Sequence, residues 1–133
     1  MIRKCVAGDY PWMLEVAKKN YPDFNAEGSK PLMLACIASE KAFVIRGDHG
    51  WAFAMLQETP WLNHKINYVD LVALDKTRAS IIEMVDILKE IKELGQKMGA
   101  AKMRLCALDE IGDLACFVNR LGGSKVGNIW EVI

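Results

Sequence analysis

Hydrophobic residues recur at helical spacing most clearly between Ser80 and Met98. One face of this segment is apolar and the opposite face is charged, which predicts an amphipathic helix with one side packed on a core. The apolar positions are Ile81, Met84, Val85, Ile87, Leu88, Ile91, Leu94 and Met98, and the charged ones include Glu83, Lys89, Glu90, Lys92 and Lys97.

Two apolar runs flank this predicted helix. The run from Ile66 to Leu74 is too apolar for a strand with one exposed face, so we expect a central strand. Lys102 to Leu108 follows as a second strand, and the order strand, helix, strand predicts a crossover in which the two strands are parallel. Asp70 lies inside the first run. Because an unpaired carboxylate is costly there, we expect it to be buried with a hydrogen-bond partner.

The rest of the chain supplies shorter elements. Asp9 and Ser29 are the expected caps of two helices, each with a proline in its first turn, and Gly47 to Gly50 is the expected turn of a hairpin. Together the elements predict a mixed α/β fold around one sheet of six or seven strands. The further strands expected are Ile2 to Val6, Lys41 to Arg46, Trp51 to Gln57 and Val126 to Ile133, and the further helices are Asp9 to Asn20, Ser29 to Ser39 and Ile111 to Leu121.

Composition narrows the class of protein. The 133 residues, 52% of them apolar, fit a single domain with one ordinary core. Seventeen basic and seventeen acidic residues cancel, which disfavours nucleic-acid binding. The four cysteines show no C-x-x-C spacing, so neither a metal site nor a disulfide framework is expected. With no signal peptide and no apolar stretch of membrane-spanning length, we expect a cytoplasmic protein without membrane contact.

The segment Cys116-Phe-Val-Asn-Arg-Leu-Gly-Gly123 resembles the F-Y-E-K-L-G-F segment that closes N-acetyltransferase domains of the GNAT superfamily. The opening Ile2-Arg3 with Asp9 and Pro11, and the order of the predicted elements, are similar to the same family along the whole chain. The resemblance implies the GNAT fold and acetyl-CoA-dependent N-acetyl transfer to a small or protein amine.

In that family a Q/R-x-x-G-x-G/A turn after the central strand holds the pyrophosphate of acetyl-CoA on its backbone N–H groups. The matching residues begin at Arg78, but Ile81 and Glu83 stand where the family has glycines. An isoleucine obstructs close approach of phosphate and a glutamate repels it. The cofactor contacts that the resemblance implies are Leu71 and Ala73 on the strand and Arg78, Ala79, Ser80, Ile81, Ile82 and Glu83 in the turn.

The residues that would carry catalysis also differ from the family. Val118 occupies the position of the tyrosine that protonates the departing thiolate, and Ile111 that of an asparagine. Asp70 and His64 remain as candidate bases. Asp70 could instead be hydrogen-bonded structure, and His64 a solvated loop residue.

Three functions therefore remain open. The first is an N-acetyltransferase that uses Arg78 as a phosphate contact. The second is a non-catalytic protein that binds a protein partner, since the chain is similar to small GNAT-fold proteins of short-tailed bacteriophages, where association with the virion would be expected. Trp61, which follows Pro60 in a loop, is the residue most suited to such an exposed surface. The third is a small-ligand sensor that uses the same cleft.

Overall fold

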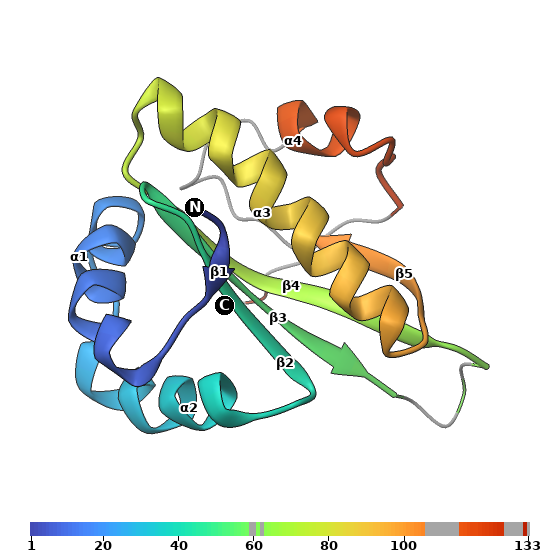
Figure 1. Cartoon of the computed structure of the whole chain (residues 1–133), viewed down its shortest axis with the longest axis horizontal. Coiled ribbons are helices and arrows are strands. Elements are labelled where there is room, and N and C mark those ends of the chain that lie inside the picture. The colour runs from blue at the N-terminus through green and yellow to red at the C-terminus, as the bar shows by residue number, and fades with distance from the viewer. Residues whose placement is uncertain (59–60, 62, 106–114, 127–131, 133) are drawn as a thin grey trace.

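The computed structural model describes residues 1–58, 61, 63–105, 115–126 and 132. Its core is a five-stranded sheet in the order β1-β2-β3-β4-β5 (Figure 1). Neighbouring strands are antiparallel except β4 and β5, whose parallel pairing confirms the predicted crossover. The strands are β1 Arg3–Lys4, β2 Ala42–Arg46, β3 Gly50–Gln57, β4 Lys65–Leu74 and β5 Ala100–Leu105. The strand expected from residue 126 onwards lies almost wholly outside the described residues.

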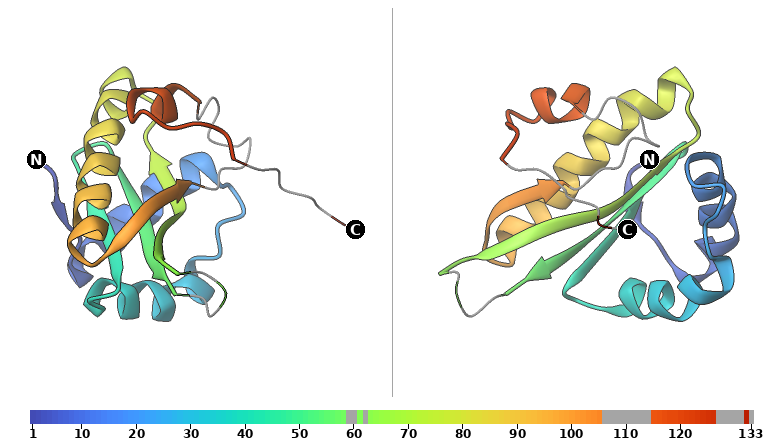
Figure 2. Two further views of the ribbon diagram at one scale, coloured as in Figure 1. Left: turned by 90° about the vertical axis from the view of Figure 1, so that its right-hand side faces the viewer. Right: turned by 180° about the vertical axis from the view of Figure 1, so that it is seen from behind.

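Helices cover both faces of the sheet (Figure 2). Helices α1 (Tyr10–Asn20) and α2 (Ala26–Ala38) lie on one face, and α1 is preceded by the short 3-10 helix Ala7–Asp9. Helix α3 (Arg78–Lys97) lies on the other face and joins β4 to β5, and α4 (Ala115–Arg120) packs against α3. The amphipathic helix predicted between β4 and β5 is therefore confirmed. Residues 111–114 of the last predicted helix lie outside the described part.

The core has two layers, one on each face of the sheet, because the strands are buried on both sides. Successive residues of a strand point to opposite faces, so β2 and β3 read as continuous apolar runs. The layer under α3 contains Phe43, Ile45, Val69, Val72, Leu74, Met84, Ile87, Leu88 and Ile91, and the layer under α1 and α2 contains Tyr10, Met13, Val16, Met33, Cys36, Val44, Trp51 and Phe53.

The cap of helix α2 lies four residues before the cap that its sequence predicts. The cap is Asn25, whose Oδ1 accepts the N–H of Gly28 at 2.9 Å, and not Ser29. Ser29 lies inside the helix with its hydroxyl 2.9 Å from the hydroxyl of Tyr10, so its polar group has a tertiary partner. Asparagine and serine are comparable caps, so the sequence is as compatible with a cap at Asn25 as with the predicted one at Ser29.

Asp9 stands at the cap position of α1, but its carboxylate does not cap that helix. It instead accepts hydrogen bonds from the guanidinium groups of Arg3 at 2.7 Å and Arg46 at 3.0 Å, and from the N–H of Val6 at 2.8 Å. The hydrogen bond from Arg3 is the main reason that the pKa of Asp9 lies well below its usual value. This buried carboxylate ties β1 and β2 to the start of α1.

Candidate functional site at the start of α3

Three segments meet at the end of the sheet where the GNAT resemblance places the cofactor turn. They are the last residue of β4, the turn between β2 and β3, and the first turn of α3. In the hairpin turn, Gly47 donates its N–H to the carbonyl of Gly50 at 2.9 Å, and the N–H of Asp75 reaches the carbonyl of His49 at 2.9 Å. The backbone of the β4–α3 connection is thus fixed to the hairpin.

Thr77 supplies the hydrogen-bond acceptors for two backbone N–H groups in the first turn of α3. Its hydroxyl oxygen accepts the N–H of Ser80 at 3.2 Å, and its carbonyl accepts the N–H of Ile81 at 3.3 Å. The buried hydroxyl of Ser80 also donates to that carbonyl, at 2.6 Å. Two of the N–H groups that the GNAT resemblance assigns to a diphosphate therefore already have partners within the helix.

Asp75 places a negative charge directly before this helix. Its carboxylate accepts the hydroxyl of Thr77 at 2.6 Å and the N–H of Thr77 at 3.0 Å, and lies 2.9 Å from Nδ1 of His49. Burial raises the pKa of Asp75, but the hydrogen bonds from Thr77 and His49 outweigh it and lower the pKa to about 2. The carboxylate is therefore ionised at neutral pH.

Glu83 is bound to the hairpin turn. One carboxylate oxygen accepts the N–H of Asp48 at 2.8 Å and the other accepts the N–H of His49 at 2.8 Å. Successive backbone N–H groups of this kind form an anion-binding concavity. A Cβ on Gly47 would overlap the carboxyl group of Glu83, so an alanine at position 47 would displace this carboxylate from its two N–H donors.

The remaining residues of the turn face solvent. Arg78 and Ala79 are exposed, and within the described residues their N–H groups have no hydrogen-bond acceptor. Ile81 and Ile82 expose 38% and 53% of their surface. The helix N-terminus therefore keeps two available N–H groups, beside two exposed apolar side chains.

The C-terminal half of β4 is bonded to residues at the end of α1. The side-chain amide of Asn20 accepts the N–H of Leu74 at 2.7 Å and donates to the carbonyl of Leu74 at 3.0 Å. The hydroxyl of Tyr21 donates to the carbonyl of Val72 at 3.1 Å. Described pairing with β5 ends earlier, at Val69. The Asn20 side chain thus forms with Leu74 the two hydrogen bonds that a neighbouring strand would otherwise form.

Sequence reasoning missed Asn20, although a signal was present. Met13, Val16, Ala17 and Asn20 follow helical spacing, and all four are buried. A polar residue that continues the apolar face of a helix is expected to have a buried partner.

The two predicted cofactor contacts on β4, Leu71 and Ala73, are paired with Phe53 and Trp51 of β3.

The expectation that Asp70 is buried with a partner is wrong. Its side chain is exposed and forms no hydrogen bond or ion pair with another described residue. Phe53 pairs with Leu71 and Ala54 with Val69, so Asp70 is the additional residue of a β-bulge. A bulge interrupts the alternation of side chains and redirects one of them. A carboxylate can therefore reach solvent from an inner strand.

His64 and Arg78 lie at opposite ends of β4. His64 directly precedes the strand and Arg78 lies beyond its other end, after the short connection to α3, and the strand itself spans roughly 30 Å at the rise of an extended chain. The structure therefore does not bring this candidate base together with the cofactor turn. Nε2 of His64 is buried without a partner in the described part of the chain.

Trp61 lies in the connection between β3 and β4, close to His64 in sequence. Its side chain is 80% exposed, the highest value among the described tryptophans. An ion pair of 3.3 Å between Glu58 and Lys65 joins the two ends of this connection. Trp61 thus places a large aromatic side chain between β3 and β4, at the end of these strands that is remote from the first turn of α3.

At the other end of the chain, Val118 lies on α4 and the position of Ile111 is outside the described residues. Helix α4 ends at Arg120 with a glycine cap: Gly122 adopts a φ of 75°, and Gly123 donates its N–H to the carbonyl of Val118 at 2.9 Å. Within the described ranges, no three His, Cys, Asp or Glu side chains lie close enough together to hold a metal ion. No helix in the same part of the chain is long and apolar enough to span a membrane.

Neither a protein-family model nor a curated protein sequence matches the chain. Solved structures do match over its full length. The BH1408 protein from Bacillus halodurans, as a tetramutant, gives a TM-score of 0.78 at 18% identity, with 100% of this chain and 99% of that chain covered. Glucosamine-6-phosphate N-acetyltransferase from Arabidopsis thaliana gives 0.78 at 14% identity, with 100% and 97% covered. The aminoglycoside N-acetyltransferase AAC(6')-Iy in complex with CoA gives 0.78 at 12% identity, with 100% and 93% covered. The chain therefore has the GNAT acetyltransferase fold along its whole length.

Proposed function

We propose that this chain is a non-catalytic protein of the GNAT fold, which binds a protein partner and does not transfer an acetyl group from acetyl-CoA. The observation that carries the proposal is the occupation of the cofactor turn by the protein's own groups. Thr77 satisfies the N–H groups of Ser80 and Ile81, and the carboxylates of Asp75 and Glu83 are fixed beside them.

A diphosphate at this turn would meet both competition and repulsion. Helix N-termini bind anions through N–H groups without internal partners, and here Thr77 already accepts two of these groups, those of Ser80 and Ile81. The ionised Asp75 directly precedes the helix and repels an anion at the remaining groups. A second negative charge, on Glu83, is held on the adjacent hairpin by two hydrogen bonds. Like charges repel strongly where solvent is partly excluded, so these groups disfavour a bound diphosphate.

The edge of β4 adds a second obstacle. A cofactor in contact with Leu71 and Ala73 has to lie along the C-terminal half of β4. Backbone groups of Val72 and Leu74 in this half are already bonded to Tyr21 and Asn20. Displacing the Asn20 amide would leave buried polar groups unpaired, which costs about 1–3 kcal/mol per group.

Trp61 supports the protein-binding part of the proposal. Tryptophan is enriched among the residues that dominate binding energy at protein interfaces, and this one is 80% exposed at the end of a hairpin. The first surface to test is therefore the β3–β4 connection around Trp61.

Acetyl transfer is the second candidate, and two observations favour it. Arg78 and Ala79 keep available N–H groups at the helix N-terminus, and the Asp70 carboxylate is exposed at the β4 bulge, where it could accept a proton. The similar fold of AAC(6')-Iy, solved with CoA, is consistent with this reading.

Calorimetric titration with acetyl-CoA separates the two candidates. We expect no detectable binding at millimolar cofactor, because two of the N–H groups in the turn already have acceptors and two carboxylates beside it repel the diphosphate. The matched variant is Ile81→Gly combined with Glu83→Gly, which restores the family glycines and removes one carboxylate; any gain of binding in this variant identifies the side chains as the obstacle. Micromolar binding by the natural chain, with an acetyl transfer rate abolished by Arg78→Ala, would contradict the proposal and establish the enzyme.

A further inference from the structure

The N-terminal half of β4 lies between β3 and β5, and residues in register form rows of side chains across the three strands. Residues that pair across neighbouring strands project from the same face of a sheet, and so do residues two positions apart in one strand. Two adjacent rows therefore share one face. The first row is Gln57, Ile66 and Lys102, and the second is Met55, Tyr68 and Arg104.

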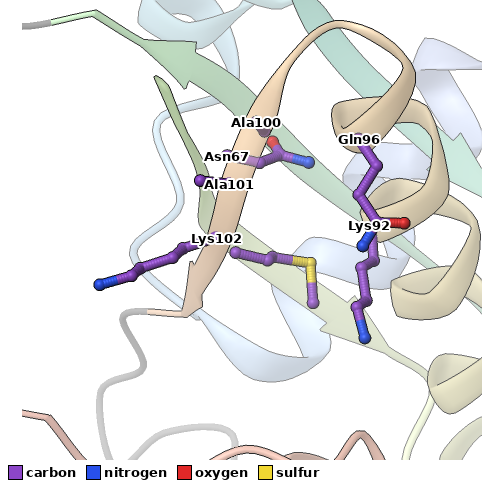
Figure 3. A pocket seen from close by; sticks show the side chains of 7 residues that line it. Asn67, Lys92, Gln96, Ala100, Ala101 and Lys102 are labelled. Atoms are coloured by element: carbon purple, nitrogen blue, oxygen red, sulfur yellow. The ribbon is translucent and has the colours of Figure 1, made fainter. Parts of the chain in front are cut away.

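This face is the one opposite α3. Asn67, which stands between the two rows on β4, faces α3 and donates its Nδ2 proton to the carbonyl of Ile91 at 2.9 Å. Its neighbours Ile66 and Tyr68 therefore project from the other face. Figure 3 shows the side chain of Lys102 pointing away from α3, in agreement with this register.

Helices α1 and α2 cover the same face further along the strands. Phe53 and Leu71, the next pair of β3 and β4 on this face, belong to the core layer under these two helices. At the two rows the cover ends, because Met55 exposes 43% of its surface and three further side chains are exposed with it. The exposed residues are Met55, Gln57, Lys102 and Arg104.

The two cations of these rows lack an internal counter-charge. The side chains of Lys102 and Arg104 form no ion pair or hydrogen bond with another described residue. Glu58, which follows β3, is already paired with Lys65 at 3.3 Å. Two positive charges therefore lie uncompensated next to the exposed thioether of Met55.

We propose that this sheet face binds an acidic segment of the partner protein. Carboxylates of the segment pair with Lys102 and Arg104, and an apolar side chain packs on Met55. Methionine, arginine and tryptophan are enriched at protein interfaces, and the connection that carries Trp61 borders the first row. Asp70, at the bulge two residues beyond Tyr68, repels an acidic segment, so the segment extends from Arg104 towards the β3–β4 connection.

The inference rests on the proposed protein-binding function and adds the chemistry of the partner. The charge complementarity selects an acidic segment, because a basic one would meet two unpaired cations. Specificity of this kind depends on like-charge repulsion as well as on attraction.

Nuclear magnetic resonance titration of the labelled, full-length chain tests the inference. The probe is a short peptide in which glutamate and leucine alternate, and the control peptide has glutamine in place of glutamate. We expect saturable shifts of the backbone amides of Met55, Gln57, Lys102 and Arg104 with the acidic peptide, which weaken as salt screens the exposed charges. Absence of these shifts, or equal shifts with the glutamine peptide, would overturn the inference.

A pair of charge-matched variants locates the binding. Lys102→Gln combined with Arg104→Gln should weaken binding of the acidic peptide roughly tenfold, as expected for the loss of two exposed ion pairs. Lys89→Gln combined with Lys97→Gln makes the same change of charge on the exposed side of α3 and should leave the affinity unchanged. Equal weakening by both variants would show general charge attraction and no site. Tighter binding of a DNA oligonucleotide than of the peptide, lost in the first variant, would assign the face to nucleic acid and contradict the inference.

This test is separate from that of the proposed function. Micromolar binding of acetyl-CoA would contradict the proposed function and leave the peptide titration unchanged. A photo-crosslinking residue at position 61 that forms an adduct with a protein segment free of acidic residues would support protein binding and overturn only the acidic character of the partner.

Discussion

At the residue scale, Glu83 has a structural role that its position in the family turn does not indicate. In the sequence it occupies a glycine position of the family turn, where it would repel phosphate. In the structure its carboxylate is held by the N–H groups of Asp48 and His49, and Gly47 leaves the room that this requires. The pair Gly47 and Glu83 therefore acts as one unit.

We predict that Gly47→Ala lowers the free energy of unfolding by about 1–3 kcal/mol, because the new methyl group would overlap the Glu83 carboxylate. In a Glu83→Ala background the same change should cost far less, since Gly47 does not adopt a positive φ. A double-mutant cycle in urea measures the coupling. Additive effects of the two substitutions would contradict the assigned contact.

The ionisation of Asp75 makes the free energy of unfolding depend on pH in the acidic range. Its folded pKa of about 2 lies below the ordinary value of 3.8, so its contribution is fully present above pH 4 and is lost as pH falls towards 2. The shift corresponds to roughly 2 kcal/mol. We predict that Asp75→Asn, which keeps an acceptor for Thr77 but does not titrate, shows a shallower loss of unfolding free energy in this window. Equal slopes for both proteins between pH 4.5 and about 2.5 would refute the assignment.

At the scale of elements, the caps decide where the helices begin. Thr77 caps α3 and Asn25 caps α2, whereas the sequence favoured Ser80 and Ser29 as the first residues. In both helices a cap lies upstream of a serine that itself forms a different hydrogen bond. Ser29 contacts a tertiary partner, Tyr10, whereas Ser80 donates to the carbonyl of Thr77 in its own helix turn, so neither serine is the cap.

We predict that Asn25→Ala lowers the free energy of unfolding by about 1 kcal/mol and speeds hydrogen exchange at the N–H of Gly28, since that N–H loses its acceptor. Ser29→Ala is the matched control. It removes the contact with Tyr10, whose hydroxyl still donates to the carbonyl of Ala26 at 2.8 Å, so exchange at Gly28 should stay unchanged. Faster exchange at Gly28 in both variants would indicate that α2 is not capped by Asn25.

At the scale of the whole molecule, the proposed loss of cofactor binding and the proposed partner site lie in two separate regions. Thr77, Asp75 and Glu83 occupy part of the turn at the start of α3, while Trp61 is exposed at the opposite end of β4. The proposed loss of cofactor binding and the proposed partner surface therefore rest on separate residues, and each can be tested without the other.

We predict that Trp61→Ala leaves the free energy of unfolding within about 0.5 kcal/mol of the natural value, because the side chain is already in solvent. A photo-crosslinking residue at position 61 should yield a discrete adduct with another protein in cells that produce the chain, and the same residue at the exposed Lys89 should not. Identical adduct patterns from both positions would contradict a partner site at Trp61.

The sequence by itself determined the order of the elements. Helical spacing in α3, the apolar run of β4 and the glycines of the β2–β3 turn are local signals, so they predicted the mixed sheet and the parallel β4–β5 pair. The resemblance to GNAT proteins came separately, from the segment Cys116 to Gly123 and the order of the elements. It also identified Ile81 and Glu83 as departures from the family turn, because that comparison needs only sequence positions.

Only the tertiary structure decided what the polar residues do. Asn20 and Leu74 are 54 residues apart, and Glu83 and His49 are 34 apart, so no local pattern could pair them. The exposure of Asp70 likewise depends on a one-residue bulge against β3, which periodicity does not encode. Local spacing specifies which side of an element is apolar, but the partners of its polar groups are set by segments that folding brings together.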